Sequence, residues 1–147
     1  MNYLLDTNIL LHYIRKDKVA QHIEVTWQPF SPPNQAIVSL VSFGEIKSIA
    51  LQSNWGDQKL KLLDQLLKTV LRADLTLDIV DKYAEIDTFS QSKYLPHKLK
   101  TTPRNMGKND LWIAATASVL NIRLLTTDSD FDHLAGLYLD LQKVDLI

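Results

Sequence analysis

NYLLDTN, residues 2–8, places a carboxylate directly after a short apolar run. Residues 3–5 are typical of a buried strand, because a strand covered on both faces is continuously hydrophobic rather than alternating. Asp6 stands where this strand ends, and Thr7 and Asn8 precede a second apolar run that is typical of a helix. The stretch therefore predicts an α/β domain whose first strand ends at an acid.

Strands and helices are expected to alternate along the rest of the chain. Further strands are predicted at residues 36–39, 70–73, 122–126 and near 143–144. Apolar residues at helical spacing predict helices at residues 9–14, 43–51, 59–68, 77–91 and 111–120. This order favours one domain over residues 1–147, with a three-layer α/β/α architecture around a central, mostly parallel sheet.

Composition restricts the classes of partner and compartment. The formal net charge is −1, so any contact with nucleic acid must come from a local patch rather than from bulk charge. The absence of cysteine excludes disulfides and thiolate metal sites, and favours a reducing compartment such as the cytoplasm. No apolar run approaches the roughly 20 residues of a membrane helix. Asp6 interrupts the only early apolar stretch, so neither a signal peptide nor a membrane anchor is expected.

Acidic residues follow the predicted strands at the edge where ligands bind in open α/β sheets. Asp6 follows the first strand, Glu45 lies in the helix after the second, and Asp128 and Asp130 follow the late strand. Asp110 opens the helix that leads into that late strand. Four carboxylates are therefore expected to gather at one edge of the sheet.

Helix capping is an alternative explanation for each acid taken singly. Ser42 and Glu45 fit a capping box, Asp6 fits a cap of the following helix, and Asp110 fits a charge near a helix N-terminus. Capping does not require the acids to converge, whereas a bound divalent cation would relieve the repulsion among them. Oxygen ligands without cysteine suit Mg²⁺ or Mn²⁺, ions that serve phosphoryl hydrolysis.

Four segments together resemble the PIN-domain ribonucleases, and among these the VapC-type toxins of prokaryotic toxin–antitoxin pairs. They are DTN at residues 6–8, Glu45, NDLWIAATA at residues 109–117 and LLTTDSDF at residues 124–131. The resemblance implies a PIN-like fold and an endoribonuclease that depends on Mg²⁺ or Mn²⁺. It also implies a homodimer, an RNA substrate (often a tRNA in this family) and a cognate antitoxin that plugs the active-site groove.

The resemblance further implies roles for individual residues. The acidic quartet that would bind the metal and catalyse cleavage is Asp6, Glu45, Asp110 and Asp128. Thr7 or Asn8 would orient the first acid or the water shell of the metal, and Thr126 would do the same on the far side. Asp130 is an extra or substitute acid for the fourth position.

A basic stretch without acids leads into the proposed site. Residues 88–109 contain no Asp or Glu but five of the sixteen Lys and Arg residues. The candidates for binding the RNA backbone are Lys98, Lys100, Arg104 and Lys108. Tyr94 is a candidate for stacking on an unpaired base. The alternative is that this stretch is a solvated loop.

Three other functions fit the residues less well. A metal-dependent phosphatase of the haloacid-dehalogenase kind needs a second acid two residues after the first, where this chain has Asn8. A phosphoreceiver domain would carry paired acids near its N-terminus and a lysine after a late strand. A non-catalytic RNA-binding or scaffold module on the same fold would not need the metal, and the presence of all four acids argues against it.

Overall fold

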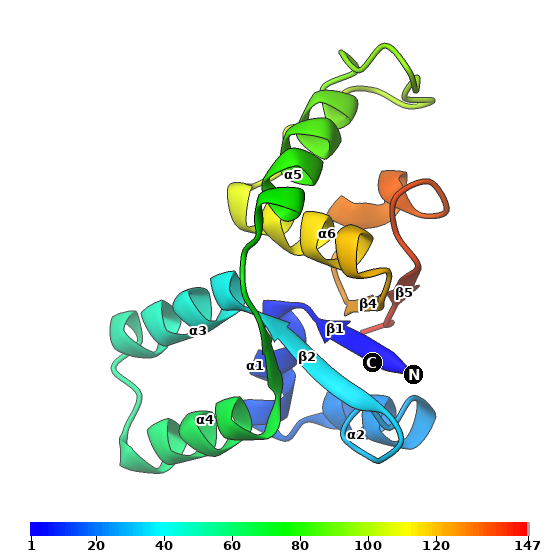
Figure 1. Cartoon of the computed structure of the whole chain (residues 1–147). Helices are drawn as coiled ribbons and strands as arrows, with labels where there is room; N and C mark the ends of the chain where they lie inside the picture. Colours follow the sequence, from blue (N-terminus) through cyan, green and yellow to red (C-terminus); the bar gives the residue numbers. More distant parts are fainter. Residues whose placement is uncertain (147) are drawn as a thin grey trace.

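The computed structural model describes residues 1–146. Its strands are β1 (Asn2–Leu5), β2 (Gln35–Ser39), β3 (Leu71–Ala73), β4 (Arg123–Thr126) and β5 (Leu141–Lys143). They form one parallel sheet in the order β3-β2-β1-β4-β5 (Figure 1). The chain builds outward from β1 through β2 and β3, and then returns to build outward on the other side through β4 and β5. The direction of winding therefore changes between β1 and β4, the place where open α/β sheets bind ligands.

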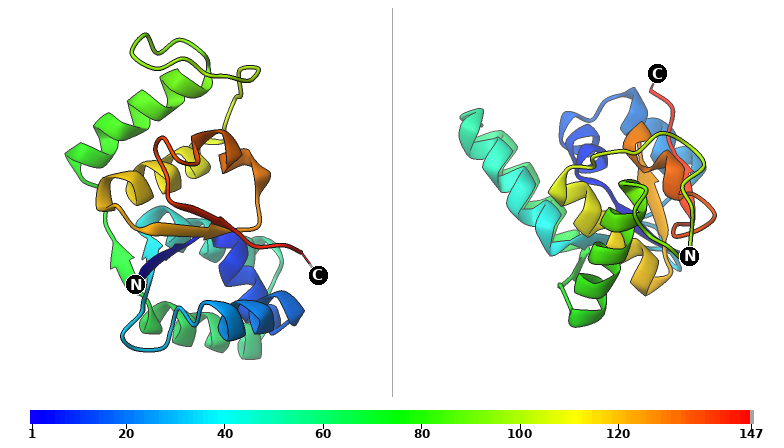
Figure 2. Two further views of the ribbon diagram at one scale, coloured as in Figure 1. Left: turned by 90° about the vertical axis from the view of Figure 1, so that its right-hand side faces the viewer. Right: turned by 90° about the horizontal axis from the view of Figure 1, so that it is seen from above.

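Helices cover both faces of this sheet (Figures 1 and 2). The helices are α1 (Thr7–Arg15), α2 (Lys18–Thr26), α3 (Leu40–Gln52), α4 (Asp57–Thr69), α5 (Leu77–Ser90) and α6 (Lys108–Leu120), with a 3₁₀ helix, η1 (Ser129–Leu134). In Figure 1, α1, α2 and α4 lie below the sheet and α5 and α6 lie above it. Among the described residues, no helix is both long enough and apolar enough to cross a bilayer.

Each face of the sheet has its own hydrophobic core. Successive side chains of a strand point to opposite faces, so Leu4 packs with α5 and α6 while Leu5 packs with α1 and α2. Leu124 and Leu125 in β4 divide between the two cores in the same way. All four of these leucines are fully buried. The continuous apolar runs of β1 and β4 are therefore explained by burial on both faces.

Four helices begin two or three residues earlier than predicted: α1 at Thr7, α3 at Leu40, α4 at Asp57 and α6 at Lys108. Ser39 ends β2 and also caps α3, because its hydroxyl accepts a hydrogen bond from the N–H of Val41 at 3.2 Å. The capping box that was the alternative explanation for Ser42 and Glu45 is therefore absent, since the helix begins at Leu40. Strand and helix join here without a loop, so the sequence shows no polar break between them.

Helix α2 has no counterpart among the predicted helices. It is nine residues long, and Asp17 caps it by accepting a hydrogen bond from the N–H of Ala20 at 3.1 Å. Its buried residues are Val19, Ala20 and Ile23. A periodic pattern needs about 11 residues to be distinctive, so a helix of this length with three buried residues gives little signal in the sequence.

The packing of α6 leads to a stability prediction. Ile113 is fully buried in the core above the sheet, so Ile113→Ala should lower the free energy of unfolding by about 2–5 kcal/mol in urea denaturation. Val25→Ala on α2 is the control, because Val25 is 78% exposed and its truncation should change stability by no more than about 0.5 kcal/mol. Equal effects of the two substitutions would contradict the placement of α6 against the sheet.

Candidate functional site

Asp6 lies at the carboxyl end of β1 and is 2% exposed. One oxygen, Oδ1, accepts a hydrogen bond from the N–H of Thr7 at 2.8 Å, so Asp6 does cap α1. The other oxygen, Oδ2, accepts a hydrogen bond from the hydroxyl of Thr126 at 2.7 Å. The same carboxylate therefore starts a helix and joins the ends of β1 and β4, so capping and a site role do not exclude each other.

Thr126 connects two of the acids. It is the last residue of β4 and is fully buried. Its hydroxyl donates to Asp6 and accepts from the N–H of Asp128 at 3.0 Å. Asp128 Oδ1 in turn accepts from the N–H of Asp130 at 2.9 Å, at the start of η1. A chain of hydrogen bonds therefore runs from the end of β1 to the first turn of η1.

Two polar contacts on the other side of the site involve residues that were not predicted to belong to it. The hydroxyl of Thr7 donates to Ser42 Oγ at 2.8 Å, which joins α1 to α3. The side-chain amide of Asn109 donates to Glu45 Oε2 at 3.1 Å, which joins α6 to α3. Asn109 stands directly before an acid in the NDLWIAATA segment and could have been chosen on that ground. Ser42 gave no such signal, because its position suggested a helix cap.

Three carboxylates converge closely enough to share one ion. Asp110, Asp128 and Asp130 each offer an oxygen, and these oxygens lie within 4.8 Å of one another. Asp110 comes from the first turn of α6, Asp128 is the N-cap of η1 and Asp130 lies in the first turn of η1. The segment that follows β4 and the first turn of α6 therefore form the centre of the cluster.

Burial and mutual repulsion hold two of the acids well above their usual pKa range. The pKa of Asp6 rises from 3.8 to about 6, chiefly because the group is buried and further because of the charges of Asp128 and Glu45. Its hydrogen bonds with Thr126 and Thr7 oppose this rise. The pKa of Asp110 rises to about 7, again chiefly through burial, with the charges of the other four acids adding to it. The charges of the other four acids therefore all reach Asp110, and two of them also reach Asp6.

The donor set suits a hard divalent cation. The converging groups are carboxylate oxygens, the ligand type that Mg²⁺ and Mn²⁺ prefer. A dication would also reverse the repulsion that raises the pKa of Asp6 and Asp110. The residues present therefore fit the kind of ion that the sequence predicts, and their number exceeds what capping of the neighbouring helices requires.

The remaining predicted residues lie at different distances from this cluster. Asn8 is exposed on the first turn of α1. Arg104 Nη1 donates to the carbonyl oxygen of Ser129 at 3.3 Å, beside the acids, and exposed Lys108 is the first residue of α6. In contrast, Lys98 and Lys100 line a separate cavity.

Tyr94 is not free for the base stacking predicted for it. Its hydroxyl donates to Glu85 at 3.2 Å, and its ring packs against the core above the sheet. The ring therefore anchors the start of the basic stretch to α5. The sequence could not reveal this anchor, because Glu85 lies nine residues earlier on a helix whose orientation only the fold determines.

The sequence is similar to one known protein family and to a bacterial ribonuclease. A family model described as the PIN domain matches residues 3–137. The chain is 29% identical over 126 residues to Ribonuclease VapC1 of Haemophilus influenzae strain R2866, which spans 86% of both chains.

Solved structures give a second comparison. VapBC2 from Rickettsia felis, bound to a DNA fragment from its promoter, matches with a TM-score of 0.77 and 26% identity, over 99% of this chain and 100% of that chain. VapBC-1 from nontypeable Haemophilus influenzae matches with a TM-score of 0.73 and 25% identity, over 97% and 98% of the two chains. These likenesses confirm the predicted α/β/α fold with its central parallel sheet.

The raised pKa of Asp6 predicts how stability depends on pH in metal-free protein. The folded state holds this proton up to about pH 6, whereas the unfolded chain releases it near pH 4. The folded state therefore binds more protons across this window, and stability falls as pH rises through it. Asp6 alone should lower the free energy of unfolding by about 3 kcal/mol across this window. In urea denaturation from pH 4 to 8, the parent should lose stability relative to Asp6→Asn; parallel curves would contradict the burial of a carboxyl here.

The hydroxyl of Thr126 provides a second prediction. Thr126→Val keeps the shape but removes the donor to Asp6 and the acceptor for the N–H of Asp128. We expect a loss of about 1–3 kcal/mol in the free energy of unfolding, and a larger loss at pH 8 than at pH 5, because ionised Asp6 needs the donor most. Thr69→Val is the matched control, since this hydroxyl bonds only an exposed helical carbonyl. A loss that is the same at both pH values would mean that the hydroxyl does not serve the carboxylate.

Proposed function

The chain belongs to the PIN-domain family, and we propose that it is a divalent-metal-dependent endoribonuclease that cleaves RNA phosphodiester bonds as the toxin of a type II toxin–antitoxin pair. The observation that carries this proposal is the set of five carboxyl groups at one edge of the sheet, in which the charges of four acids act on Asp110. Such a set lowers the stability of the metal-free fold, so a role in binding explains it better than a role in folding. The likeness to Ribonuclease VapC1 supports the choice of RNA.

The proposed metal ligands are the acids of the predicted quartet together with Asp130. The three that converge most closely are Asp110, Asp128 and Asp130. Asp6 and Glu45 would complete the negative field that attracts a cation, since both raise the pKa of Asp110. When bound, Mg²⁺ or Mn²⁺ would supply an activated water and neutralise charge on the phosphate.

The residues around the acids would keep them in place. Asp6 is held by hydrogen bonds to both of its oxygens, one from α1 and one from the end of β4. Glu45 is held by the side-chain amide of Asn109. Carboxylates fixed in this way lose little conformational entropy when a ligand binds. Thr7, Thr126 and Asn109 are therefore proposed as positioning residues, while Asn8 is exposed and could contact only groups in solvent.

Positive charge beside the acids would attract the RNA backbone. Arg104 is held against the segment after Asp128, and Lys108 lies two residues before Asp110. The N-terminal end of α6 adds the partial positive charge of a helix terminus, which favours phosphate groups. We propose that these groups bring a phosphodiester over the carboxylates, despite the overall charge of −1.

The proposal includes a cognate antitoxin as partner. Two structural neighbours with at least 25% identity are VapBC proteins from Rickettsia felis and Haemophilus influenzae. A groove of about 430 Å³ between α3 and α4 offers an apolar surface for such a partner. It is lined in part by Phe43, Leu51, Leu60, Leu63 and Leu67. The homodimer, a tRNA as substrate and a cytoplasmic location belong to the proposal as implications of the family resemblance.

Asp6→Asn tests the proposal. With Mg²⁺ or Mn²⁺ present, cleavage of RNA should fall by orders of magnitude, because the substitution removes a fixed negative charge from the proposed metal site. Stability without metal should stay the same or rise, since one repelling charge is gone. Asp78→Asn, an exposed change in the first turn of α5, is the control and should leave cleavage unchanged.

The result also separates the alternatives. Full cleavage by Asp6→Asn would overturn the nuclease proposal at its centre. A parent protein that binds RNA but cleaves it with neither ion would favour the non-catalytic RNA-binding module. Release of phosphate from a small phosphomonoester, with RNA left intact, would favour the phosphatase.

A further inference from the structure

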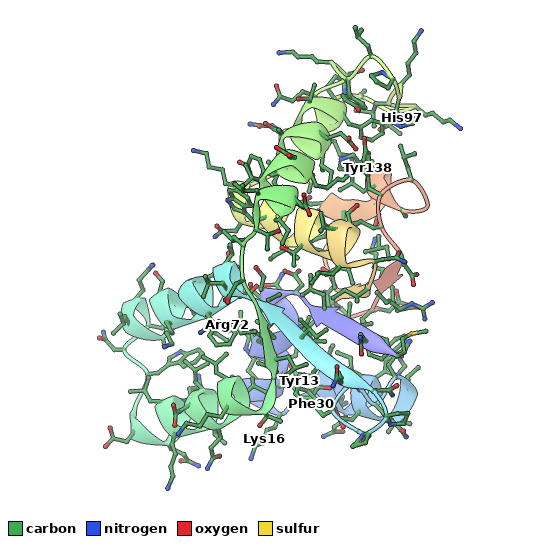
Figure 3. The ribbon with its side chains drawn as sticks, viewed as in Figure 1. Tyr13, Lys16, Phe30, Arg72, His97 and Tyr138 are labelled. Carbon is green, nitrogen blue, oxygen red and sulfur yellow. The ribbon has the colours of Figure 1, made fainter. Side chains whose placement is uncertain are left out.

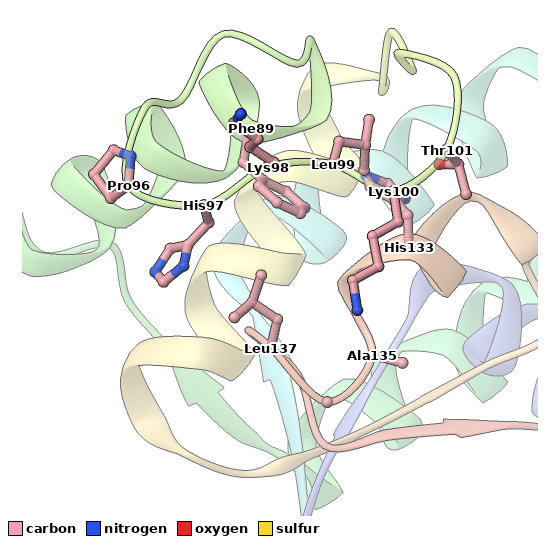
Figure 4. Close-up of a pocket in the computed structure, with 11 residues that line it drawn as sticks. Phe89, Pro96, His97, Lys98, Leu99, Lys100, Thr101, His133, Ala135 and Leu137 are labelled. Atoms are coloured by element: carbon pink, nitrogen blue, oxygen red, sulfur yellow. The ribbon is translucent and has the colours of Figure 1, made fainter.

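A second concave site lies beside the carboxylates but does not include them. The loop between α5 and α6 closes over a cavity of about 590 Å³, which is called the loop cavity below (Figure 4). Residues 96–101 form one side of it, residues 133 and 135–137 form the other, and Phe89 contributes from α5. Its volume falls in the range of about 300–1,000 Å³ that is typical of small-ligand sites. Two segments more than thirty residues apart therefore meet around a space large enough for a ligand.

One wall of the loop cavity contains two parallel aromatic rings. The rings of Phe89 and His133 lie 6.4 Å apart between centroids, with an angle of 2° between their planes. His133 Nε2 and the hydroxyl of Ser90 are hydrogen-bonded at 2.7 Å, which fixes the imidazole. The two rings therefore give this side of the loop cavity an aromatic surface, in which the hydrogen bond with Ser90 holds the imidazole in place.

The rest of the lining combines apolar surface with positive charge. Leu137 is 48% exposed although it follows a well-packed helix. Lys98 and Lys100 stand on the opposite side, and Figure 4 shows Lys100 extending toward the segment that carries Ala135. None of the described residues that line the loop cavity is acidic. This charge pattern favours an anion, and the apolar surface favours a flat organic group.

The imidazole of His97 is held near the mouth of the loop cavity. It lies edge-on to the ring of Tyr138 at 6.4 Å and tilted against Tyr94 at 5.8 Å (Figure 3). His97 remains exposed despite these neighbours. A ring that is both exposed and supported from behind is a suitable platform for stacking.

We propose that the loop cavity holds one unpaired nucleotide of the RNA that the proposed nuclease cleaves, and this inference rests on that proposed function. A phosphate would lie on Lys100, which extends across the cavity toward Ala135 (Figure 4), and the base would pack against His97 and the apolar wall. Recognition of RNA commonly combines these two elements, basic side chains for the backbone and rings for a base that is free of pairing.

The position of the loop cavity relative to the acids supports a neighbouring nucleotide rather than the one at the cleaved bond. Helix η1 runs from Ser129, beside Asp128, to Leu134, and its residue His133 lines the loop cavity. Six residues of 3₁₀ helix span roughly 12 Å at about 2.0 Å per residue. Arg104 lies between the two places, held to the carbonyl of Ser129. One strand could therefore run from the loop cavity past Arg104 to the carboxylates.

Binding of RNA to metal-free protein tests this inference without cleavage. The probe is a labelled, unstructured eight-nucleotide RNA, followed by fluorescence anisotropy over a range of salt concentrations. Lys100→Glu should weaken binding and reduce the slope of log K against log salt by about 0.7, the value for one single-strand phosphate contact. His97→Ala should weaken binding about tenfold through lost stacking, and should not affect binding of the same RNA in a full duplex.

Lys93→Glu is the matched control, because Lys93 is exposed in the same basic stretch but does not line the loop cavity. Lys93→Glu should weaken RNA binding much less than Lys100→Glu does. Equal effects of the two reversals, or binding that neither Lys100→Glu nor His97→Ala changes, would overturn the inference. Cleavage by the parent with Mn²⁺ is measured separately. If the parent cleaves RNA but Lys100→Glu binds RNA as well as the parent does, only the proposed role of the loop cavity is overturned. If Lys100→Glu weakens RNA binding but the parent does not cleave RNA, only the proposed nuclease activity is overturned.

Discussion

The hydrogen bond between the hydroxyl of Thr126 and the buried carboxylate of Asp6 connects the fold to the site. It exists because β1 and β4 are neighbours in the sheet, with Leu5 paired to Leu125 and the N–H of Asp6 donating to the carbonyl of Leu125 at 3.0 Å. A slip of one residue in this pairing would move Thr126 away and turn the core leucines to the wrong faces. The register that buries both cores therefore also sets the distance between the first acid and the last strand.

The same geometry makes the metal-free protein less stable than it could be. Asp6 and Asp110 have raised pKa values because they are buried close to other carboxyl groups. Hydrogen bonds from Thr126 and Thr7 offset part of this effect for Asp6. Among residues 1–146, no comparable hydrogen bond opposes the rise in the pKa of Asp110, and four other acids add to it. A site that is unfavourable without its ligand and favourable with it is the arrangement expected of a metal centre, since the ion both neutralises the charges and stabilises the fold.

The sequence predicted the features that depend on local pattern and failed for those that depend on the folded chain. Asp6 could be placed because an acid directly after a buried strand stands out, and the alternation of strands with helices was enough to predict a parallel sheet. Ser42 and Asn109 were missed as site residues, because their partners lie 35 and 64 residues away. The basic stretch was predicted as one RNA-binding surface, but the fold divides it: Arg104 lies beside the acids, while Lys100 lines the loop cavity.

Location of the ion in a crystal is the most direct test of the central claim, that the acids at this edge of the sheet form a metal centre. Crystals soaked in Mn²⁺ at pH 8, where both raised pKa values are exceeded, would be measured for anomalous scattering. We expect a peak among the carboxylates of Asp110, Asp128 and Asp130, and loss of that peak in crystals of Asp110→Asn. Strong Mn²⁺ peaks elsewhere in well-ordered crystals, with none among these carboxylates, would contradict it.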